Sequence, residues 1–159
     1  MEDVLQDFTR TVEDAASRLL SMSDGQASAK REEGKWSAKE IVGHLIDSAS
    51  NNHQRFVRAQ LEEDLVFDGY EQEGWVLVQA YAREDWPQLV NLWKLYNLHI
   101  AHVMRQAPEA ERLRPRARHN LHEICAAAVS KDEPATLEQL MRDYIVHLKN
   151  HLRQIFPDG

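Results

Sequence analysis

Apolar residues recur along the chain at steps of three and four, the spacing that predicts amphipathic helices. The first such pattern runs from about Val4 to Met22. A polar connection over residues 23–35 follows it and contains Gly25 and Gly34. No segment shows the alternation of apolar and polar residues that is typical of strands. The pattern therefore predicts an all-α protein.

The clearest helix start in the sequence lies at Ser37. Ser37 and Glu40 have the spacing of a capping box, in which each side chain accepts a hydrogen bond from the backbone N–H of the other residue. Trp36 precedes the cap and can pack against Ile41 in the first turns of the helix. The apolar face that follows predicts a helix that continues to about Glu62.

Two more helices are predicted in the middle of the chain. The shorter one covers residues 71–82 and follows a connection around residues 67–70. Asp85 can cap the longer one, and Pro87 fits its first turn, where no intrahelical N–H bond is lost. Apolar residues keep the helical spacing until Pro108, which ends this helix.

The last helix also has a clear start, because Thr136 and Gln139 form a second capping box. The apolar face that follows extends to Ile155. Residues 109–134, before this helix, show no clear pattern beyond a short helix around 121–128. This segment is the part of the chain for which the sequence predicts least.

Four long amphipathic helices, with no repeat or linker between them, predict a single domain over residues 1–159. We expect a four-helix bundle with additional short helices in the connections. The composition agrees, because 43% hydrophobic and 28% charged residues is the balance of a protein with a packed core.

Charge and composition narrow the range of partners. The chain has 19 Lys and Arg against 26 Asp and Glu, so most of its surface would repel a nucleic acid. No stretch approaches the roughly 18 apolar residues that span a bilayer, and the acidic start MEDVLQDFTR is unlike a secretion signal. Cys125, the single cysteine, lies in an apolar run and is expected to be a small buried side chain. We therefore expect a cytoplasmic protein that binds neither nucleic acid nor membrane.

Two histidines on the last predicted helix can share a ligand. His147 and His151 are four residues apart, so their side chains lie on one face, roughly 6 Å apart at the Cβ atoms. Such a pair can bind one metal ion, although it is often only part of a polar stripe. A third ligand would decide between these interpretations. His44 is the leading candidate, because it lies at the edge of an apolar helix face, where an imidazole needs a partner.

The residues alone leave the partner of His44 open. A local hydrogen bond to Ser48, one turn further on, would satisfy the imidazole. A metal ion shared with the last helix would also do so, a common use of facing helices in bundles. Asp47, three residues after His44, is a candidate for orienting that imidazole, or it faces solvent. His99 and His102 form another pair that could join or replace a ligand.

The remaining histidines, the single cysteine and known catalytic motifs give weaker indications of a functional site. His53 can reach the bundle interior, whereas His119 and His122 are expected to be exposed. Cys125 as a nucleophile would need an activating base such as His122, and apolar surroundings raise a thiol's pKa and make it inert. The sequence contains no Gly-rich phosphate loop and no GxSxG, HExxH or CxxC motif.

Three parts of the sequence together resemble the DinB/YfiT-like family. The run WSAKEIVGHLIDS, residues 36–48, resembles the second helix of these proteins and is continued by Asn51, Asn52, Arg55 and Phe56. Residues 70–75 and the last helix resemble the family as well. The resemblance implies a four-helix bundle, often a homodimer, with a metal site of one histidine from helix two and an H-x3-H pair from the last helix. In this chain those positions are His44, His147 and His151.

The resemblance also implies a range of functions. Family members are described as candidate metal-dependent hydrolases, and relatives are S-transferases for small thiols such as bacillithiol, mycothiol or glutathione. We expect zinc or nickel as the metal and a small-molecule substrate such as a low-molecular-weight thiol. Three histidines leave coordination positions open, which suits S-transfer or hydrolysis. The alternative is a non-catalytic metal-binding or structural helical-bundle dimer. No general acid or base is assigned, and Tyr70 and Trp75 are expected at a pocket mouth.

Overall fold

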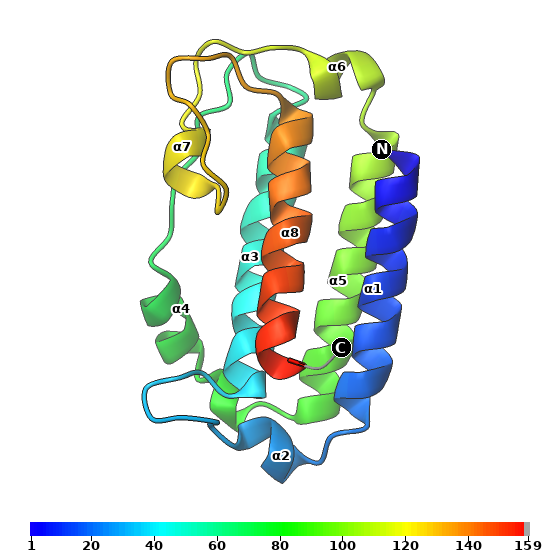
Figure 1. The fold of residues 1–159 in the computed structure, drawn as a ribbon, viewed down its shortest axis with the longest axis vertical. Coiled ribbons are helices and arrows are strands. Elements are labelled where there is room, and N and C mark those ends of the chain that lie inside the picture. The colour runs from blue at the N-terminus through cyan, green and yellow to red at the C-terminus, as the bar shows by residue number, and fades with distance from the viewer. Residues whose placement is uncertain (158–159) are drawn as a thin grey trace.

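The computed structural model describes residues 1–157 and is built from four long helices that lie side by side (Figure 1). These helices are α1 (Glu2–Leu20), α3 (Ala38–Arg58), α5 (Trp86–Gln106) and α8 (Leu137–Ile155). α5 packs against α1 and α3, and α8 packs against the same two helices. The predicted all-α four-helix bundle is confirmed, and no strand is present within residues 1–157. No helix in that part of the chain combines the length and apolar character that crossing a bilayer requires.

The direction of the helices decides where the long connection runs. Figure 1 shows α1 and α8 running one way and α3 and α5 the other. Because α3 and α5 are parallel, residues 59–85 between them must travel the whole length of the bundle. This crossover carries α4 (Gln72–Gln79) and a 3-10 helix (Tyr81–Arg83), and both contact α3. The crossover therefore lies beside the helix that bears His44.

Aromatic side chains fill the centre of the bundle. Trp93 is fully buried on α5, and the rings of Phe8 and Phe56 lie edge-on to Tyr144, at centroid distances of 6.1 and 5.8 Å. The Tyr144 hydroxyl donates a 2.5 Å hydrogen bond to Asn97 Oδ1, so the buried phenol is satisfied. The apolar stripes of all four helices thus meet in one core.

The predicted helix starts agree with the structure. The Ser37 N–H donates to Glu40 Oε2 at 2.8 Å, and the Glu40 N–H donates to Ser37 Oγ at 3.3 Å. The Thr136 box forms in the same way, and the Asp85 side chain accepts from the backbone of the third residue of α5. Hydrogen bonds between residues three positions apart are therefore enough to define these helix starts.

Three predicted helix ends were wrong. α3 ends at Arg58 instead of about Glu62, because Arg116 donates a 2.7 Å hydrogen bond to the Ala59 carbonyl where the chain turns. α4 covers Gln72–Gln79 instead of 71–82, because Ala80 adopts the left-handed conformation with φ of 52°.

The third wrong end lies in the segment before α8. The helix predicted over 121–128 is only α7 (Leu121–Ile124), since the N–H groups of Ala126 and Ala127 donate to the Asp143 carboxylate instead of to helix carbonyls. Two other short helices occur where none was predicted, α2 (Asp24–Ser28) in the polar connection and α6 (Glu109–Leu113) after α5.

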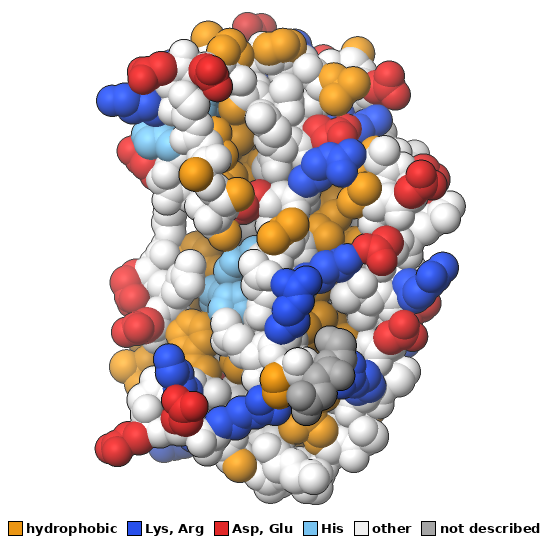
Figure 2. Space-filling model, in the orientation of Figure 1, with side chains coloured by type: hydrophobic (Ala, Val, Ile, Leu, Met, Phe, Trp, Pro, Cys, Tyr) orange, Lys and Arg blue, Asp and Glu red, His pale blue; other side chains and the backbone are white. Residues whose placement is uncertain are grey.

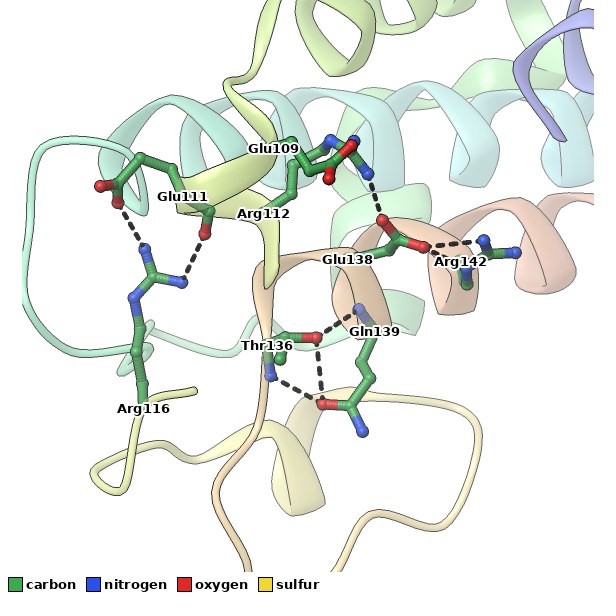
Figure 3. Close-up of polar contacts among 8 residues, drawn as sticks. All are labelled: Glu109, Glu111, Arg112, Arg116, Thr136, Glu138, Gln139 and Arg142. Atoms are coloured by element: carbon green, nitrogen blue, oxygen red, sulfur yellow. Dashed lines mark hydrogen bonds and ion pairs between the residues drawn. The ribbon is translucent and has the colours of Figure 1, made fainter. Parts of the chain in front are cut away.

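Polar contacts hold the segment before α8 against the end of the bundle (Figure 3). Arg112 forms an ion pair with Glu138, which also accepts a 2.7 Å hydrogen bond from Arg142. Arg116 donates to the carbonyl and to the carboxylate of Glu111, both at 3.2 Å. The Arg112–Glu138 pair joins residues that are 26 positions apart, so periodicity alone does not reveal it.

Candidate metal centre

Three histidine side chains from two helices converge at one place beside the crossover. His44 lies on α3, and His147 and His151 lie on α8. One ring nitrogen from each lies within 4.8 Å of the others. Among residues 1–157, no other group of three His, Cys, Asp or Glu side chains meets this criterion. Figure 2 shows histidine side chains in a hollow between α8 and the crossover.

The local sequence explains this arrangement. His147 and His151 are one helical turn apart, so their rings project from the same face, with centroids 4.5 Å apart. α3 packs directly against α8, which brings the His44 ring to centroid distances of 5.2 Å from His147 and 4.6 Å from His151. The three predicted ligands are therefore together in space.

Burial keeps these imidazoles neutral. His44 is fully buried, and desolvation, reinforced by the two neighbouring histidines, lowers its pKa to about 3. Desolvation also lowers the pKa of His151 to about 4 and lowers the pKa of His147 below its usual value. At neutral pH each ring therefore keeps a nitrogen lone pair, the form of imidazole that binds metals.

The hydrogen bonding of the three rings is incomplete. His44 Nε2 and His147 Nε2 are 3.1 Å apart, so one ring can donate to the other. Nδ1 of His44 and Nδ1 of His151 are buried and have no hydrogen-bond partner among the described residues. Buried polar atoms without a partner cost free energy. Three neutral, converging and incompletely bonded imidazoles fit a divalent transition-metal ion in size and in ligand type.

Trp36 covers the histidines, a role that the sequence reasoning missed. Its ring lies 5.1 Å from that of His44 and stacks on that of His151 at 6.4 Å, with an interplanar angle of 25°. A residue just before a helix cap folds back over the first turns of that helix. In the sequence, the position of His44 two helical turns after Trp36 was the feature that could have indicated this contact.

Asp47 makes its hydrogen bonds away from the histidines. Its Oδ1 accepts from the Tyr81 hydroxyl and from Gln79 Nε2, each at 2.7 Å. No hydrogen bond joins Asp47 to His44 within the part of the chain that the structure describes. Burial raises the pKa of the Asp47 carboxyl, and the two donors oppose this shift. Asp47 thus ties α3 to the crossover.

The local alternative for His44 and the expectation that His119 is exposed are wrong. Ser48 does not bond to His44, since its carbonyl and hydroxyl accept from Asn52. His119, expected to be exposed, is only 8% exposed and its Nε2 lies 2.9 Å from the Glu133 carbonyl. It is buried because the backbone around it pairs with Leu65. His122 is exposed, as predicted.

His53, His99 and His102 lie outside the converging group. The ring of His53 is 5.0 Å from that of His99 and its Nδ1 lies 3.4 Å from the Tyr96 hydroxyl. His99 and His102 stack at 6.3 Å, and both are exposed. The i, i+3 pair on α5 therefore does not join the histidines of α3 and α8.

Two cavities border the converging histidines. A cavity of about 190 Å³ has His147 in its wall, together with Tyr70 and Cys125. A larger one of about 660 Å³ has His151 and Trp36 in its wall. Cys125 is half-buried instead of buried, and desolvation together with Asp143 raises the pKa of its thiol to about 12, which disfavours the thiolate that a nucleophilic cysteine needs. The converging histidines thus have a space on either side.

Comparison with known proteins identifies relatives of the same fold. A protein of Oceanobacillus iheyensis, named as a candidate metal-dependent hydrolase, is 28% identical over 81 residues, 48% of this chain and 46% of that protein. The match thus spans about half the length of that relative. YfiT from Bacillus subtilis, reported as a candidate metal-dependent hydrolase with an unusual four-helix bundle topology, has a TM-score of 0.73 at 20% identity, covering 96% of this chain and 84% of YfiT.

A second solved structure shares the fold more distantly. The mycothiol-dependent maleylpyruvate isomerase has a TM-score of 0.66 at 13% identity and covers 95% of this chain but 58% of its own. At such identities these likenesses show the fold alone. The model of the DinB superfamily matches residues 7–155, nearly the whole chain. This protein therefore belongs to the DinB superfamily.

Proposed function

We propose that this protein is a metal-dependent enzyme acting on small molecules, with His44, His147 and His151 as the ligands of one zinc or nickel ion. The observation that carries the proposal is the convergence of three neutral imidazoles within 4.8 Å, with open space on either side. Two relatives named as candidate metal-dependent hydrolases support it.

The chain's own residues prepare the site for a metal. Desolvation keeps all three rings deprotonated at neutral pH, and the packing of α3 against α8 holds them together. Trp36 shields His44 and His151 from solvent on one side. Three protein ligands leave further coordination positions for a substrate. When bound, the metal supplies a Lewis acid, which lowers the pKa of a thiol or of a water molecule.

Between the two reactions, we place S-transfer from a low-molecular-weight thiol first. Transfer brings two substrates together, and the two cavities offer a separate space for each. Both oxygens of Asp143 accept backbone N–H groups, and Asp47 Oδ1 accepts from Tyr81 and Gln79, so only the buried Oδ2 of Asp47 has no partner among the described residues. A free thiol, with a pKa of about 8.5, depends less on a general base than water does.

Hydrolysis is the second candidate, and the names of the relatives favour it. The same three histidines would serve, with water in place of the thiol. The third reading is a metal-binding or structural bundle without turnover. The first two readings predict an activity that depends on the histidines, and the third predicts none.

We also propose a cytoplasmic location and a homodimeric state for this protein. A reducing cytoplasm maintains the free thiols that S-transfer consumes. We propose a homodimer, for which the exposed Leu92 and Leu95 on α5 offer apolar surface. Light scattering on the purified protein distinguishes a dimer from a monomer.

Activity assays on one preparation distinguish S-transfer, hydrolysis and a non-catalytic protein. Tag-free protein is loaded with zinc or nickel and given a small thiol with 1-chloro-2,4-dinitrobenzene, or p-nitrophenyl acetate without thiol. Thiol loss above the background, absent from a variant with His147 and His151 changed to Ala, supports S-transfer. Ester cleavage without thiol, with the same dependence, supports hydrolysis instead. Metal-loaded protein without either activity favours the non-catalytic reading.

A further inference from the structure

Arg55 is a buried cation without an acidic partner. Arg55 is only 6% exposed and lies on α3, the helix that also carries His44. It donates to the Asp68 carbonyl at 2.7 Å and makes one long contact of 3.5 Å to Asn52 Oδ1. Among the described residues no carboxylate lies within ion-pair distance of its guanidinium. A guanidinium has five N–H donors, so most of its capacity is unused.

Arg116, which is 3% exposed, shows how the same fold treats another buried arginine. It pairs with the Glu111 carboxylate at 3.2 Å and donates to the carbonyls of Glu111 and Ala59. A buried charge is costly unless it is paired and hydrogen-bonded. Arg116 meets that condition within the chain, whereas Arg55 does not.

The unpaired guanidinium lines the cavity of about 190 Å³ that also has His147 in its wall. Tyr70 lines the same cavity, and burial raises the pKa of its phenol to about 12, so the hydroxyl keeps its proton and can donate. A cavity of this size accommodates a small ligand. The cation and the phenol thus face the space that adjoins the converging histidines.

The charge balance of this cavity favours a singly charged anion. Two carboxylates also line it, those of Asp143 and Glu123. Both Asp143 oxygens accept backbone N–H groups, and the Glu123 side chain is 64% exposed and contacts Asn120 and His122. Arg55 therefore supplies one positive charge, and a phosphate dianion would meet additional repulsion from these acids.

We propose that Arg55 and Tyr70 bind a carboxylate group of the substrate in the cavity beside His147. The guanidinium fork matches the planar carboxylate in shape, as a single-point cation does not. The assignment rests on the proposed function, because it takes the ligand of this cavity to be the substrate that reacts at the converging histidines. The substrate class is then a small carboxylic acid whose reactive part points toward His147.

Benzoate and benzamide test this inference, because they differ in charge and scarcely in shape. Binding is measured by ligand-observed NMR titration of metal-free protein, with inorganic phosphate as a third probe. We expect benzoate to bind at least ten times more tightly than benzamide and phosphate. Equal binding of benzoate and benzamide, or tighter binding of phosphate, would overturn the carboxylate assignment.

Two substitutions locate the binding. Arg55→Gln should weaken benzoate binding at least tenfold, and Arg55→Lys should weaken it less, since the charge is kept but the fork is lost. The matched control is Arg58→Gln, one turn further along α3, because Arg58 is exposed and does not line this cavity. Unchanged binding in a folded Arg55→Gln protein, checked by circular dichroism, contradicts the proposal. Equal losses in the Arg55 and Arg58 variants contradict it as well.

The titration uses metal-free protein so that the carboxylate site can be tested independently of the proposed metal site. The same titration is made with the variant that has His147 and His151 changed to Ala. Benzoate binding that persists there and still requires Arg55 supports the carboxylate site, even if the protein binds no metal. Loss of benzoate binding in that variant while Arg55→Gln retains it would place the anion on the histidines and overturn the assignment to Arg55.

Discussion

At the scale of single residues, burial determines the chemistry of the three converging histidines. Each imidazole loses hydration when α3 packs on α8, and its pKa falls as a result. Solvent-exposed histidines would be partly protonated near pH 6.5 and would bind a metal less well. The position of the rings in the fold therefore keeps their nitrogen lone pairs available, as the proposed metal site requires.

The lowered pKa values predict that the metal-free protein loses stability in acid. Between the folded pKa of His44, about 3, and the usual value of about 6.5, the unfolded chain binds a proton that the folded chain does not. The free energy of unfolding should therefore fall as the pH drops below about 6.5. Urea unfolding at about pH 7 and about pH 5 measures this. His44→Gln should show a smaller drop than the unchanged protein, and an equal drop would contradict the account.

Asp47 is expected to contribute to stability more than to metal binding. Tyr81→Phe removes one of its two donors and should lower the free energy of unfolding by about 1–3 kcal/mol. Because neither residue bonds to His44, zinc affinity should stay unchanged in Tyr81→Phe and in Asp47→Asn. Calorimetric titration with zinc measures this. A loss of affinity of about tenfold or more in Asp47→Asn would show that Asp47 orients His44 after all.

At the scale of helices, the ends that depend on distant residues were not predictable, whereas the capped starts and the ends of α5 and α8 were. Ser37 and Thr136 cap their helices through side chains three residues away, so a short stretch of sequence contains the whole interaction. The end of α3 depends on Arg116, and the end of α7 depends on Asp143, which are distant in the sequence. Such ends become predictable only once the packing of the chain is known.

The close packing of α3 on the crossover makes a prediction about Gly43. A Cβ atom at this position would overlap the ring of Tyr81, whose hydroxyl donates to Asp47. Gly43→Ala should therefore cost about 1–3 kcal/mol of stability through overpacking. The control is Gly25→Ala in α2, where no atom lies within 4 Å of the added methyl group and helix propensity favours Ala. Urea unfolding of both variants measures the difference, and equal stabilities would contradict the close approach.

The candidate site was predictable in part. The spacing of His147 and His151 shows that they share a helix face, but the residues alone left His44 between a local bond and a shared ligand. Which helix faces α8 is a property of the packing. Arg55 could not be recognised as an unpaired cation from sequence, because an absent partner is visible only in three dimensions.

At the scale of the whole molecule, the proposed metal would connect helices that are distant in the chain. His44 and His147 are separated by 103 positions and lie on the two packed helices α3 and α8. A ligand that binds only the folded state stabilises it. Its binding would therefore oppose separation of these two helices.

Zinc should accordingly raise the melting temperature. Free metal at about 100 times its Kd adds about 2.7 kcal/mol, which for a chain of this size corresponds to a shift of roughly 5–10 °C. Thermal unfolding followed by circular dichroism measures the shift. The variant with His147 and His151 changed to Ala serves as the control and should not shift. A similar shift in both proteins would mean that zinc binds elsewhere.

The most direct test of the central claim is elemental analysis of tag-free protein purified without nickel resin, beside the variant with His147 and His151 changed to Ala. We predict close to one zinc or nickel ion per chain in the unchanged protein and almost none in the variant. An unchanged protein that contains no metal, and binds none when zinc or nickel is added, would contradict the three-histidine metal centre.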